Sequence, residues 1–308
     1  MPSFIVPARN NPVLTAACLS TLLHSVQQLN WASQFILIDD ESPPGENILD
    51  IFHQHRKDAA GHEVKIIRSR KRQHYSGVFS IGLYHAARDP VFFISNDMLV
   101  TPAFLQALFT VAQRSPLIGI VRGTSNHTDS HPEHQVPITP PPKAYPEVDA
   151  FSRNIFRQYG NSFVEDQLLS GDAILIQRPL IQRIGVLDLR FFGYFGDIDY
   201  GLRAQLAGFR LTCAKGAWLF HQGGGHIYQE MALEKRSIGE VMARRLAMVD
   251  AAYQEFRKKW NIAAPEHWGA AGIDVDPIRL LNTARAHAQG VPLKYEFPVA
   301  VLDGLEFH

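Results

Sequence analysis

The sequence predicts an α/β fold built on a Rossmann-like, mostly parallel sheet that is flanked by helices. Short apolar runs bounded by turn-forming residues are typical of strands that are buried on both faces. Segments whose apolar residues recur at helical spacing alternate with these runs, which indicates right-handed βαβ units over about the first 120 residues. The apolar runs are 4–6, 35–38, 64–67 and 91–94.

The helices of this half are predicted from apolar stripes and from proline at their first positions. The first stripe runs from Leu14 to Leu29 and indicates a helix with one buried face. The expected helices begin at Pro12, near Ile48, at Gly77 and at Thr101, and another strand follows at 117–121.

Residues 122–150 contain several prolines and show no sustained period. A long irregular segment within a compact domain is commonly a functional loop or a lid, and we expect one here. His127, His131 and His134 are candidate metal ligands, but the alternative, which a flexible polar loop favours, is that these histidines are solvated.

Regular elements return at Leu168. An aromatic loop at 191–196 precedes a helix whose first turn carries Asp197 and Asp199. Residues 261–308 show no clear pattern. The expected elements are a strand within 168–176, helices at 178–184 and 197–207, strands at 210–214 and 217–220, and a long polar helix from about 227 to 260.

The composition is that of a globular chain, with 46% apolar and 19% charged residues. The 30 basic and 30 acidic side chains cancel, so no overall field favours nucleic acid as a partner. Cys18 and Cys213 are too few for a thiolate cluster and suit reduced, buried thiols. Because the sequence shows no signal-like start and no run of about 18 apolar residues, we expect a soluble, cytoplasmic protein.

Polar residues follow the strand at 91–94. Ligands of open α/β sheets bind beyond the carboxyl ends of the strands, so Asn96 and Asp97 are placed to hold a polyphosphate and its divalent cation. The other interpretation is that Asn96-Asp97 only begins the turn before a helix. The first interpretation predicts an enzyme that uses a phosphate-bearing donor.

Three segments together resemble the inverting nucleotide-sugar glycosyltransferases of family 2, in particular the bacterial rhamnosyltransferase-like members. The resemblance covers about residues 3–260. The segments run from Ile5-Val6-Pro7 to Asp39-Asp40-Glu41-Ser42, over Phe93-Ile94-Ser95-Asn96-Asp97, and from Ser170-Gly171-Asp172 through Gly196-Asp197-Ile198-Asp199 to His221-Gln222-Gly223-Gly224.

The resemblance implies a GT-A fold with a nucleotide-binding half and a smaller acceptor half. The glycosyltransferase domain is expected over 1–225, with its nucleotide-binding half at about 1–121 and its acceptor half at about 150–225. Residues 226–308 are then a helical C-terminal extension.

The resemblance also implies how the donor is held. Asp39 or Asp40 is expected to contact the base and ribose. Asn96-Asp97 corresponds to the family's Asp-x-Asp motif, with Asp97 reaching a Mg²⁺ or Mn²⁺ on the diphosphate. His221 matches a histidine that approaches the metal or the diphosphate in some relatives. The residues expected at the nucleotide and its cation are Pro7, Arg9, Asp39, Asp40, Asn96, Asp97 and His221.

Sugar transfer also needs a carboxylate that takes the proton of the acceptor hydroxyl. The resemblance places Asp197 at the family's catalytic base. Asp197 and Asp199 are two residues apart at a helix start, so only one of them is expected to face the pocket. One base and one in-line displacement predict inversion at the anomeric carbon. The residues expected near the acceptor are Gly171, Asp172, Tyr194 and Asp199.

Two departures from the family pattern leave alternatives open. Gly196-Asp197 replaces the usual Glu-Asp, and Ser95 stands at the first place of the Asp-x-Asp-like motif. They favour, as an alternative, a catalytically silent relative that binds a nucleotide or a glycan. A nucleotidyltransferase is the other alternative, but the loop at 7–11 lacks the glycines of a phosphate-binding loop.

The expected partners are a nucleotide diphosphate sugar donor and a glycan or lipid-linked acceptor, in the synthesis of a bacterial surface polysaccharide. The composition of the C-terminal segment does not decide between a homodimer and peripheral association with the inner membrane. The sugar, the nucleotide base and the linkage are not predicted.

Overall fold

The structure is a computed structural model that describes residues 1–128, 131–223, 231, 237–263 and 276–308. Its helices and strands follow the order expected for an α/β domain and continue to the C-terminus. The strands are β1 Ser3–Ala8, β2 Gln34–Asp40, β3 Glu63–Ser69, β4 Val91–Ile94, β5 Met98–Leu99, β6 Ile118–Ser125, β7 Phe163–Asp166, β8 Ala173–Ile176, β9 Arg210–His221 and β10 Leu305–Phe307. The α-helices are α1 Pro12–Gln28, α2 Ile48–Asp58, α3 His74–His85, α4 Pro102–Ala112, α5 Tyr145–Tyr159, α6 Arg178–Ile184, α7 Gly196–Leu206, α9 Ile238–Lys259 and α10 Pro277–Ala286; 3₁₀ turns lie at Pro132–His134 and Val299–Gly304.

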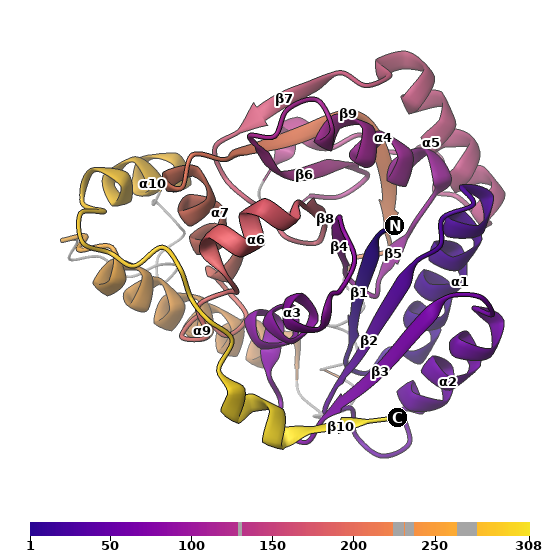
Figure 1. The fold of residues 1–308 in the computed structure, drawn as a ribbon, viewed down its shortest axis with the longest axis horizontal. Helices are drawn as coiled ribbons and strands as arrows, with labels where there is room; N and C mark the ends of the chain where they lie inside the picture. The colour runs from indigo at the N-terminus through magenta and orange to yellow at the C-terminus, as the bar shows by residue number, and fades with distance from the viewer. Residues whose placement is uncertain (129–130, 224–230, 232–236, 264–275) are drawn as a thin grey trace.

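The strands form one sheet in the order β10-β3-β2-β1-β4-β8-β6-β9-β5, with β7 paired to β9 (Figure 1). β3, β2, β1 and β4 are parallel, as the alternation of strands and helices predicts. β8 lies antiparallel between β4 and β6, which the sequence does not indicate. Because β1, β2 and β4 are parallel, their carboxyl ends meet at one edge of the sheet, and the polar residues after them are brought together.

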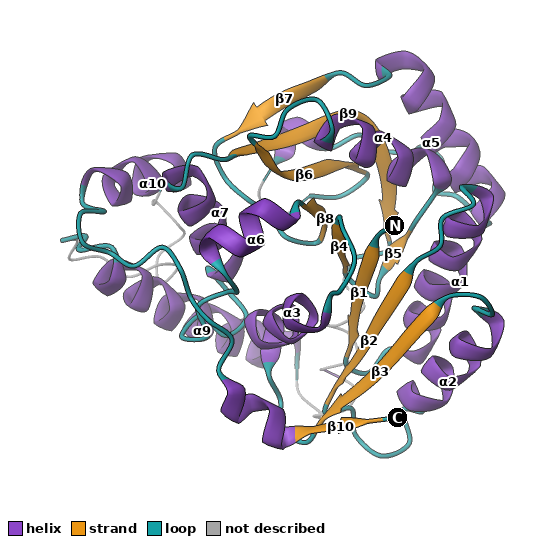
Figure 2. Cartoon of the chain, in the orientation of Figure 1, coloured by secondary structure: helices purple, strands orange, loops and turns teal. Residues whose placement is uncertain are grey.

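Helices cover both faces of this sheet (Figure 2). On one face α1, α2 and α4 pack over Phe4, Val6 and Phe92, and on the other α3, α6 and α7 pack over Ile5 and Phe93. Neighbouring strand residues point to opposite faces, so a strand buried on both sides is apolar at every position. This explains why the predicted strands read as continuous apolar runs.

Two elements lie where the sequence predicts an irregular segment. β6 extends to Ser125, and α5 begins at Tyr145, so the irregular part is shorter than 122–150. β7 then pairs with β9 at an edge of the sheet. The two strands expected at 210–214 and 217–220 form the single strand β9, whose pairing with β6 shifts register between Cys213 and Trp218.

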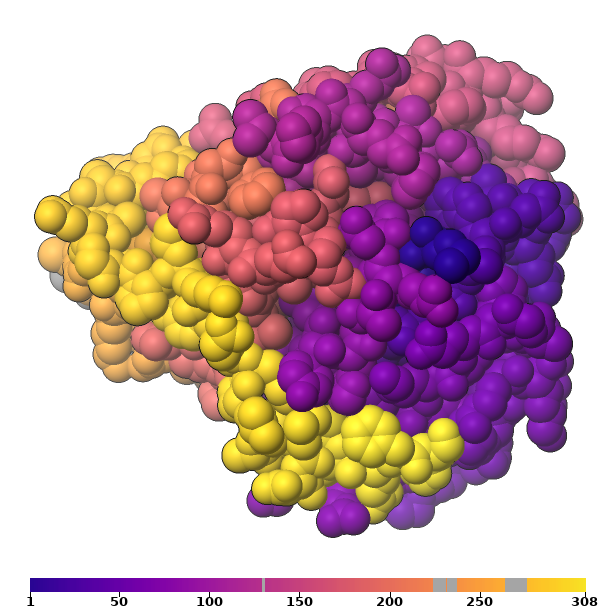
Figure 3. Space-filling model, in the orientation of Figure 1, coloured from indigo at the N-terminus to yellow at the C-terminus, as the bar shows by residue number. Residues whose placement is uncertain are grey.

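The C-terminal segment is not only helical. α9 and α10 pack against α7 through a separate cluster of buried apolar side chains. The chain then crosses the domain and ends in β10, which pairs antiparallel with β3. In Figure 3 the last residues run as a yellow band along the surface of the N-terminal half. The start of the predicted polar helix, at about 227, lies outside the described residues.

Among the helices that the structure describes, none is long and apolar enough to cross a membrane.

Candidate active site

A cleft of about 600 Å³ opens at the carboxyl ends of β1, β2 and β4. Its walls come from segments far apart in the sequence, including the start of α7, the end of β9 and the middle of α9. The sequence-predicted residues that line it are Pro7, Arg9, Asp40, Asn96, Asp97, Asp172, Tyr194, Asp197 and His221. Asp97 and Asp197 therefore share one cleft.

Asp97 and His221 form a pair at one end of the cleft. Asp97 Oδ2 lies 3.1 Å from His221 Nε2. Their backbones are also joined, because β5 pairs with β9 and the amide of Gln222 donates to the carbonyl of Asp97 at 2.9 Å. Burial opposes the charged imidazolium, but the hydrogen bond and charge of Asp97 outweigh it and raise the pKa of His221 to about 9. A cation bound here has to displace that proton.

Asn126 holds the backbone of His221 in place. Its side-chain oxygen accepts from the amide of His221 at 2.6 Å, and its side-chain nitrogen donates to the carbonyl of the same residue at 2.9 Å. These two hydrogen bonds to the backbone of one residue fix the end of β9. No sequence pattern indicates this role, since Asn126 falls in the segment that was expected to be irregular.

Asp197 lies in the first turn of α7 and faces the cleft. One carboxylate oxygen accepts from the amide of Gly171 at 3.2 Å, and the other accepts from the amide of Ile198 at 2.9 Å. Burial and the nearby charge of Asp172 raise the pKa of Asp197 to about 6. The carboxylate is therefore mostly ionised at neutral pH and is a stronger base than an exposed aspartate.

Gly171 positions Asp197 instead of lining the cleft. Tyr75 donates from its hydroxyl to the carbonyl of Gly171 at 3.2 Å, and a Cβ on Gly171 would lie only 1.8 Å from that hydroxyl oxygen. Only glycine leaves room for this contact. The loop before β8 is thus joined on one side to α3 and on the other to the carboxylate of Asp197.

The space beside Gly196 explains the missing glutamate of the Glu-Asp pair. A Cβ at this position would lie 2.2 Å from Oγ of Ser76 in α3. Oγ of Ser76 is buried and has no hydrogen-bond partner among the described residues. A side chain at this position of α7 would therefore force the Ser76 hydroxyl in α3 to move.

The two aspartates at the end of β2 have different surroundings. Asp40 lines the cleft and accepts from the amides of Gln73 and His74 at 2.6 and 3.0 Å. Burial raises the pKa of Asp40 to about 6 against the effect of these hydrogen bonds. Asp39 is 1% exposed, accepts from the amide of Ser42 and does not line the cleft.

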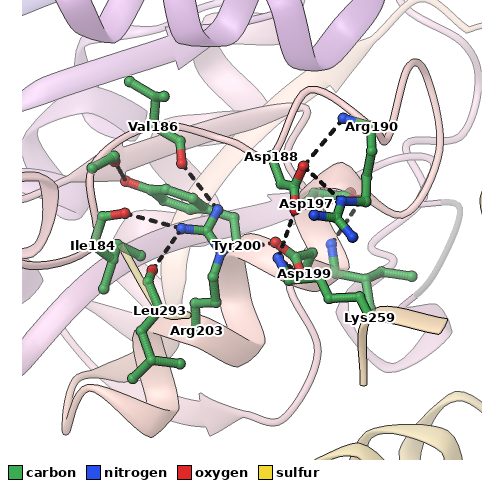
Figure 4. A network of polar contacts seen from close by, with 12 residues as sticks. Ile184, Val186, Asp188, Arg190, Asp197, Asp199, Tyr200, Arg203, Lys259 and Leu293 are labelled. Carbon is green, nitrogen blue, oxygen red and sulfur yellow. Dashed lines mark hydrogen bonds and ion pairs between the residues drawn. The ribbon is translucent and has the colours of Figure 1, made fainter. Parts of the chain in front are cut away.

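Asp199 does not contact the cleft, contrary to the expectation that it meets the acceptor. It is fully buried, with its oxygens 2.8 Å from Arg203 Nε and 2.7 Å from Lys259 Nζ (Figure 4). Lys259 also pairs with Asp188 at 3.0 Å, and the indole of Trp260 donates to Asp199 at 3.1 Å. Asp197 and Asp199 thus point in different directions, and Asp199 joins α7 to α9.

Several cleft residues were missed by the sequence analysis as site residues. Arg72 and the start of α3 line the cleft. One wall comes from α9, a helix with no recognisable motif. The missed residues include Ala8, Asn10, Arg72, His74, Tyr75, Val78, Arg245, Met248 and Val249.

His131 and His134 are not solvated, which corrects the expectation for that loop. They are 3% and 2% exposed. The supporting acid that the sequence did not reveal is Asp166, which lies 32 residues further on and is 2.7 Å from His134. His127 alone of the three is exposed.

Comparison with known families decides the assignment. The sequence profile of the family described as "Glycosyl transferase family 2" matches residues 3–184, which is more than half of the chain. The chain belongs to this family. A search of curated protein sequences gave no match.

Solved glycosyltransferase structures share the fold. The mannosyltransferase PcManGT from Pyrobaculum calidifontis, in complex with GDP-Man and Mn²⁺, superposes with a TM-score of 0.53 at 13% identity, covering 98% of this chain and 77% of that one. S. aureus TarS 1–349 gives a TM-score of 0.51 at 13% identity, covering 83% and 72%. GalNAc-T7 with UDP, GalNAc and Mn²⁺ gives 0.55 at 15% identity, covering 94% and 54%. The predicted GT-A fold is confirmed, and the chain is a glycosyltransferase.

Proposed function

We propose that this glycosyltransferase moves a sugar from a nucleoside diphosphate to a hydroxyl acceptor with inversion of the anomeric carbon. The observation that carries the proposal is the cleft that Asp97, His221 and Asp197 share. Asp97 and His221 form a pair suited to a cation, and Asp197 is a raised-pKa carboxylate in the same cleft. These are the two chemical needs of the reaction, stabilisation of the leaving diphosphate and removal of a proton.

The donor is held at the carboxyl ends of the parallel strands. Pro7, Arg9, Asp40 and Asn96 line this part of the cleft, and Arg72 adds a second guanidinium. The two arginines complement the negative charge of the diphosphate.

Asp97 and His221 fit a divalent cation. Their facing atoms are a carboxylate oxygen and an imidazole nitrogen 3.1 Å apart, and the cleft leaves room for phosphate oxygens and water as further ligands. Mg²⁺ or Mn²⁺ bound there would neutralise charge on the departing diphosphate. The solved structures of PcManGT and GalNAc-T7 both contain Mn²⁺.

Asp197 acts as the general base in this proposal. The amides of Gly171 and Ile198 orient its carboxylate, and its raised pKa increases its basicity. Because one base assists one displacement, the product has the opposite anomeric configuration.

The acceptor is proposed to bind between Tyr194, Asp172 and the wall formed by α9. Tyr194 offers an aromatic face for the C–H side of a sugar ring, and Asp172 offers a hydrogen-bond acceptor. We place the reaction in bacterial surface polysaccharide synthesis at the cytoplasmic side of the inner membrane, on the basis of the family resemblance, with a glycan or lipid-linked acceptor.

The experiment uses a panel of nucleotide sugars, including UDP, GDP and dTDP donors, with Mn²⁺. Binding is measured by calorimetry and donor hydrolysis by proton NMR, which also reports the anomer released. Wild type should release the inverted sugar, and Asp197→Asn should bind the donor but lose activity by a factor of about 100 or more. Retention would instead point to a nucleophilic carboxylate such as Asp172, and donor binding without turnover in wild type would favour the silent relative.

A further inference from the structure

A second group of metal-ligating side chains lies outside the cleft. One nitrogen of His131, one of His134 and one carboxylate oxygen of Asp166 lie within 4.8 Å of one another. Among the residues that the structure describes, this is the one group of three or more histidine, cysteine and acidic residues with such spacing. None of the three lines the nucleotide cleft.

The three side chains come from two segments and are all buried. His131 and His134 flank the 3₁₀ turn after β6, with their rings stacked at 5.2 Å, and Asp166 ends β7. Asp166 is 8% exposed. His134 Nε2 lies 2.7 Å from Asp166 Oδ1, so the contact joins the loop to the sheet edge.

Two atoms of the group have unused bonding capacity. His131 Nδ1 donates to Glu133 Oε1 at 3.1 Å, which leaves a lone pair on Nε2. His131 Nε2 and Asp166 Oδ2 are both buried and have no hydrogen-bond partner among the described residues. Burial and the charge of Arg122 lower the pKa of His131. A neutral imidazole oriented by a carboxylate is the usual form of a histidine ligand.

Two positively charged side chains near this group, Lys215 and Arg122, limit which metal ion can bind there. Lys215 Nζ lies 3.4 Å from His134 Nδ1, which is a long contact, and the Lys215 side chain is partly exposed. Arg122 is buried nearby, so a purely electrostatic site for Mg²⁺ would be weak. Imidazole nitrogens bind Zn²⁺ strongly and Mg²⁺ poorly.

We propose that His131, His134 and Asp166 bind one Zn²⁺ ion, with Glu133 as the residue that positions His131. Zn²⁺ would take the place of the His134 proton that now faces Asp166, and it would satisfy the unpartnered atoms of His131 and Asp166. The ion serves a structural purpose and is separate from the cation of the nucleotide cleft.

Zinc binding at this site would also affect the cleft. Asn126, whose side chain holds the backbone of His221, precedes His131 by five positions in the sequence. Zn²⁺ would fasten His131 and His134 to β7 and so limit movement of the end of β9. The zinc-bound protein is therefore expected to be more stable than the zinc-free protein.

The test is Zn²⁺ binding by the full chain after treatment with EDTA and removal of the chelator. Zn²⁺ is titrated against a chromophoric chelator in excess Mg²⁺. In the His221→Gln background, which removes the imidazole of the cleft, the chain should bind about one equivalent of Zn²⁺, and adding His134→Gln or Asp166→Asn should weaken this binding about 100-fold or more. Adding the exposed-histidine change His24→Gln to the same background should leave Zn²⁺ binding unchanged.

Thermal unfolding of wild type gives a second test that needs no variant. The Tm should rise by about 3 °C or more when Zn²⁺ replaces EDTA, since the ion binds only the folded chain. Unchanged Zn²⁺ binding when either His134→Gln or Asp166→Asn is added to His221→Gln would overturn the proposal, as would loss of binding in His221→Gln alone. Absence of binding by wild type, with equal Tm in Zn²⁺ and EDTA, would overturn it as well.

Discussion

Asp197 shows how single residues set the chemistry of the cleft. Its carboxylate is held by two amides at the start of α7, while burial and Asp172 raise its pKa to about 6. The same two causes that strengthen the base make its ionised form costly in the folded protein. Activity and stability are therefore expected to depend on pH in opposite directions.

Asp172→Asn should shift the acidic limb of kcat/KM to lower pH, by about one unit or less. The like charge of Asp172 raises the pKa of Asp197, so its removal lets Asp197 ionise at lower pH. The pH–rate profiles of wild type and variant measure the shift. Asp50→Asn, an exposed acid on α2, is the matched control and should leave the limb in place. A limb that stays at its wild-type pH in Asp172→Asn would contradict the assignment of Asp197 as the base.

Asp197→Asn should raise the free energy of unfolding at pH 8 by about 1–3 kcal/mol while removing activity. The folded pKa of Asp197 lies above its unfolded value, so the charge destabilises the folded state above about pH 6 and the effect fades as the wild-type carboxyl protonates. Urea unfolding at pH 8 and pH 5 tests this. The difference in free energy of unfolding between Asp197→Asn and wild type should be larger at pH 8 than at pH 5. A difference that grows toward pH 5 would contradict a raised pKa for Asp197.

Gly196→Ala should destabilise the protein by about 1–3 kcal/mol, because the new Cβ would meet Oγ of Ser76. Ser76→Ala removes that oxygen, which has no hydrogen-bond partner among the described residues, and should be nearly neutral. In the double variant the two changes should couple favourably, as measured in a double-mutant cycle by urea unfolding. Purely additive effects would mean that the close approach of α3 and α7 is not the cause.

At the scale of elements, buried ion pairs attach α9 to α7, the helix whose first turn carries Asp197. Asp199 contacts Arg203 within α7 and Lys259 at the end of α9, and Lys259 contacts Asp188 (Figure 4). Arg203 also donates to the carbonyls of Ile184, Val186 and Leu293. α9 in turn forms a wall of the cleft, so this network holds that wall in place.

Asp199→Ala should lower the free energy of unfolding by about 3–5 kcal/mol, because two buried cations would lose their carboxylate partner. Glu165→Ala removes the partner of Arg210 in an exposed pair and should cost about 1 kcal/mol or less. Chemical denaturation of the two variants gives the comparison. Equal effects would show that the buried network does not hold α9 to α7.

Helices and strands were predicted correctly where the local pattern of apolar residues matches the burial that the fold gives them. The first strands are buried on both faces, so their apolar runs reveal them directly. α5 was missed because it follows a proline-rich stretch and is amphipathic with few buried residues. The sequence predicted two strands where the structure has the single strand β9. The cause is the irregular pairing at 214–217, which places Lys215 and Gly216 in the middle of the strand.

At the scale of the whole molecule, long-range contacts limit what the sequence reveals. Residues 261–308 had no assignable pattern because β10 is three residues long and is stabilised by pairing with β3, more than 230 positions earlier. Asp97, Asp197 and His221 were identified because they belong to motifs. Arg245 and Met248 were not, since only the fold places α9 beside the cleft.

The central claim is that Asp97 and His221 hold the cation of a bound nucleoside diphosphate in the cleft that also contains Asp197. Calorimetry of UDP, GDP and dTDP with Mn²⁺ and with EDTA, on wild type and Asp97→Asn, tests it most directly. The account predicts that Mn²⁺ strengthens binding of the preferred nucleotide about 10-fold or more in wild type and has little effect in Asp97→Asn. An equal gain from Mn²⁺ in both proteins would contradict it.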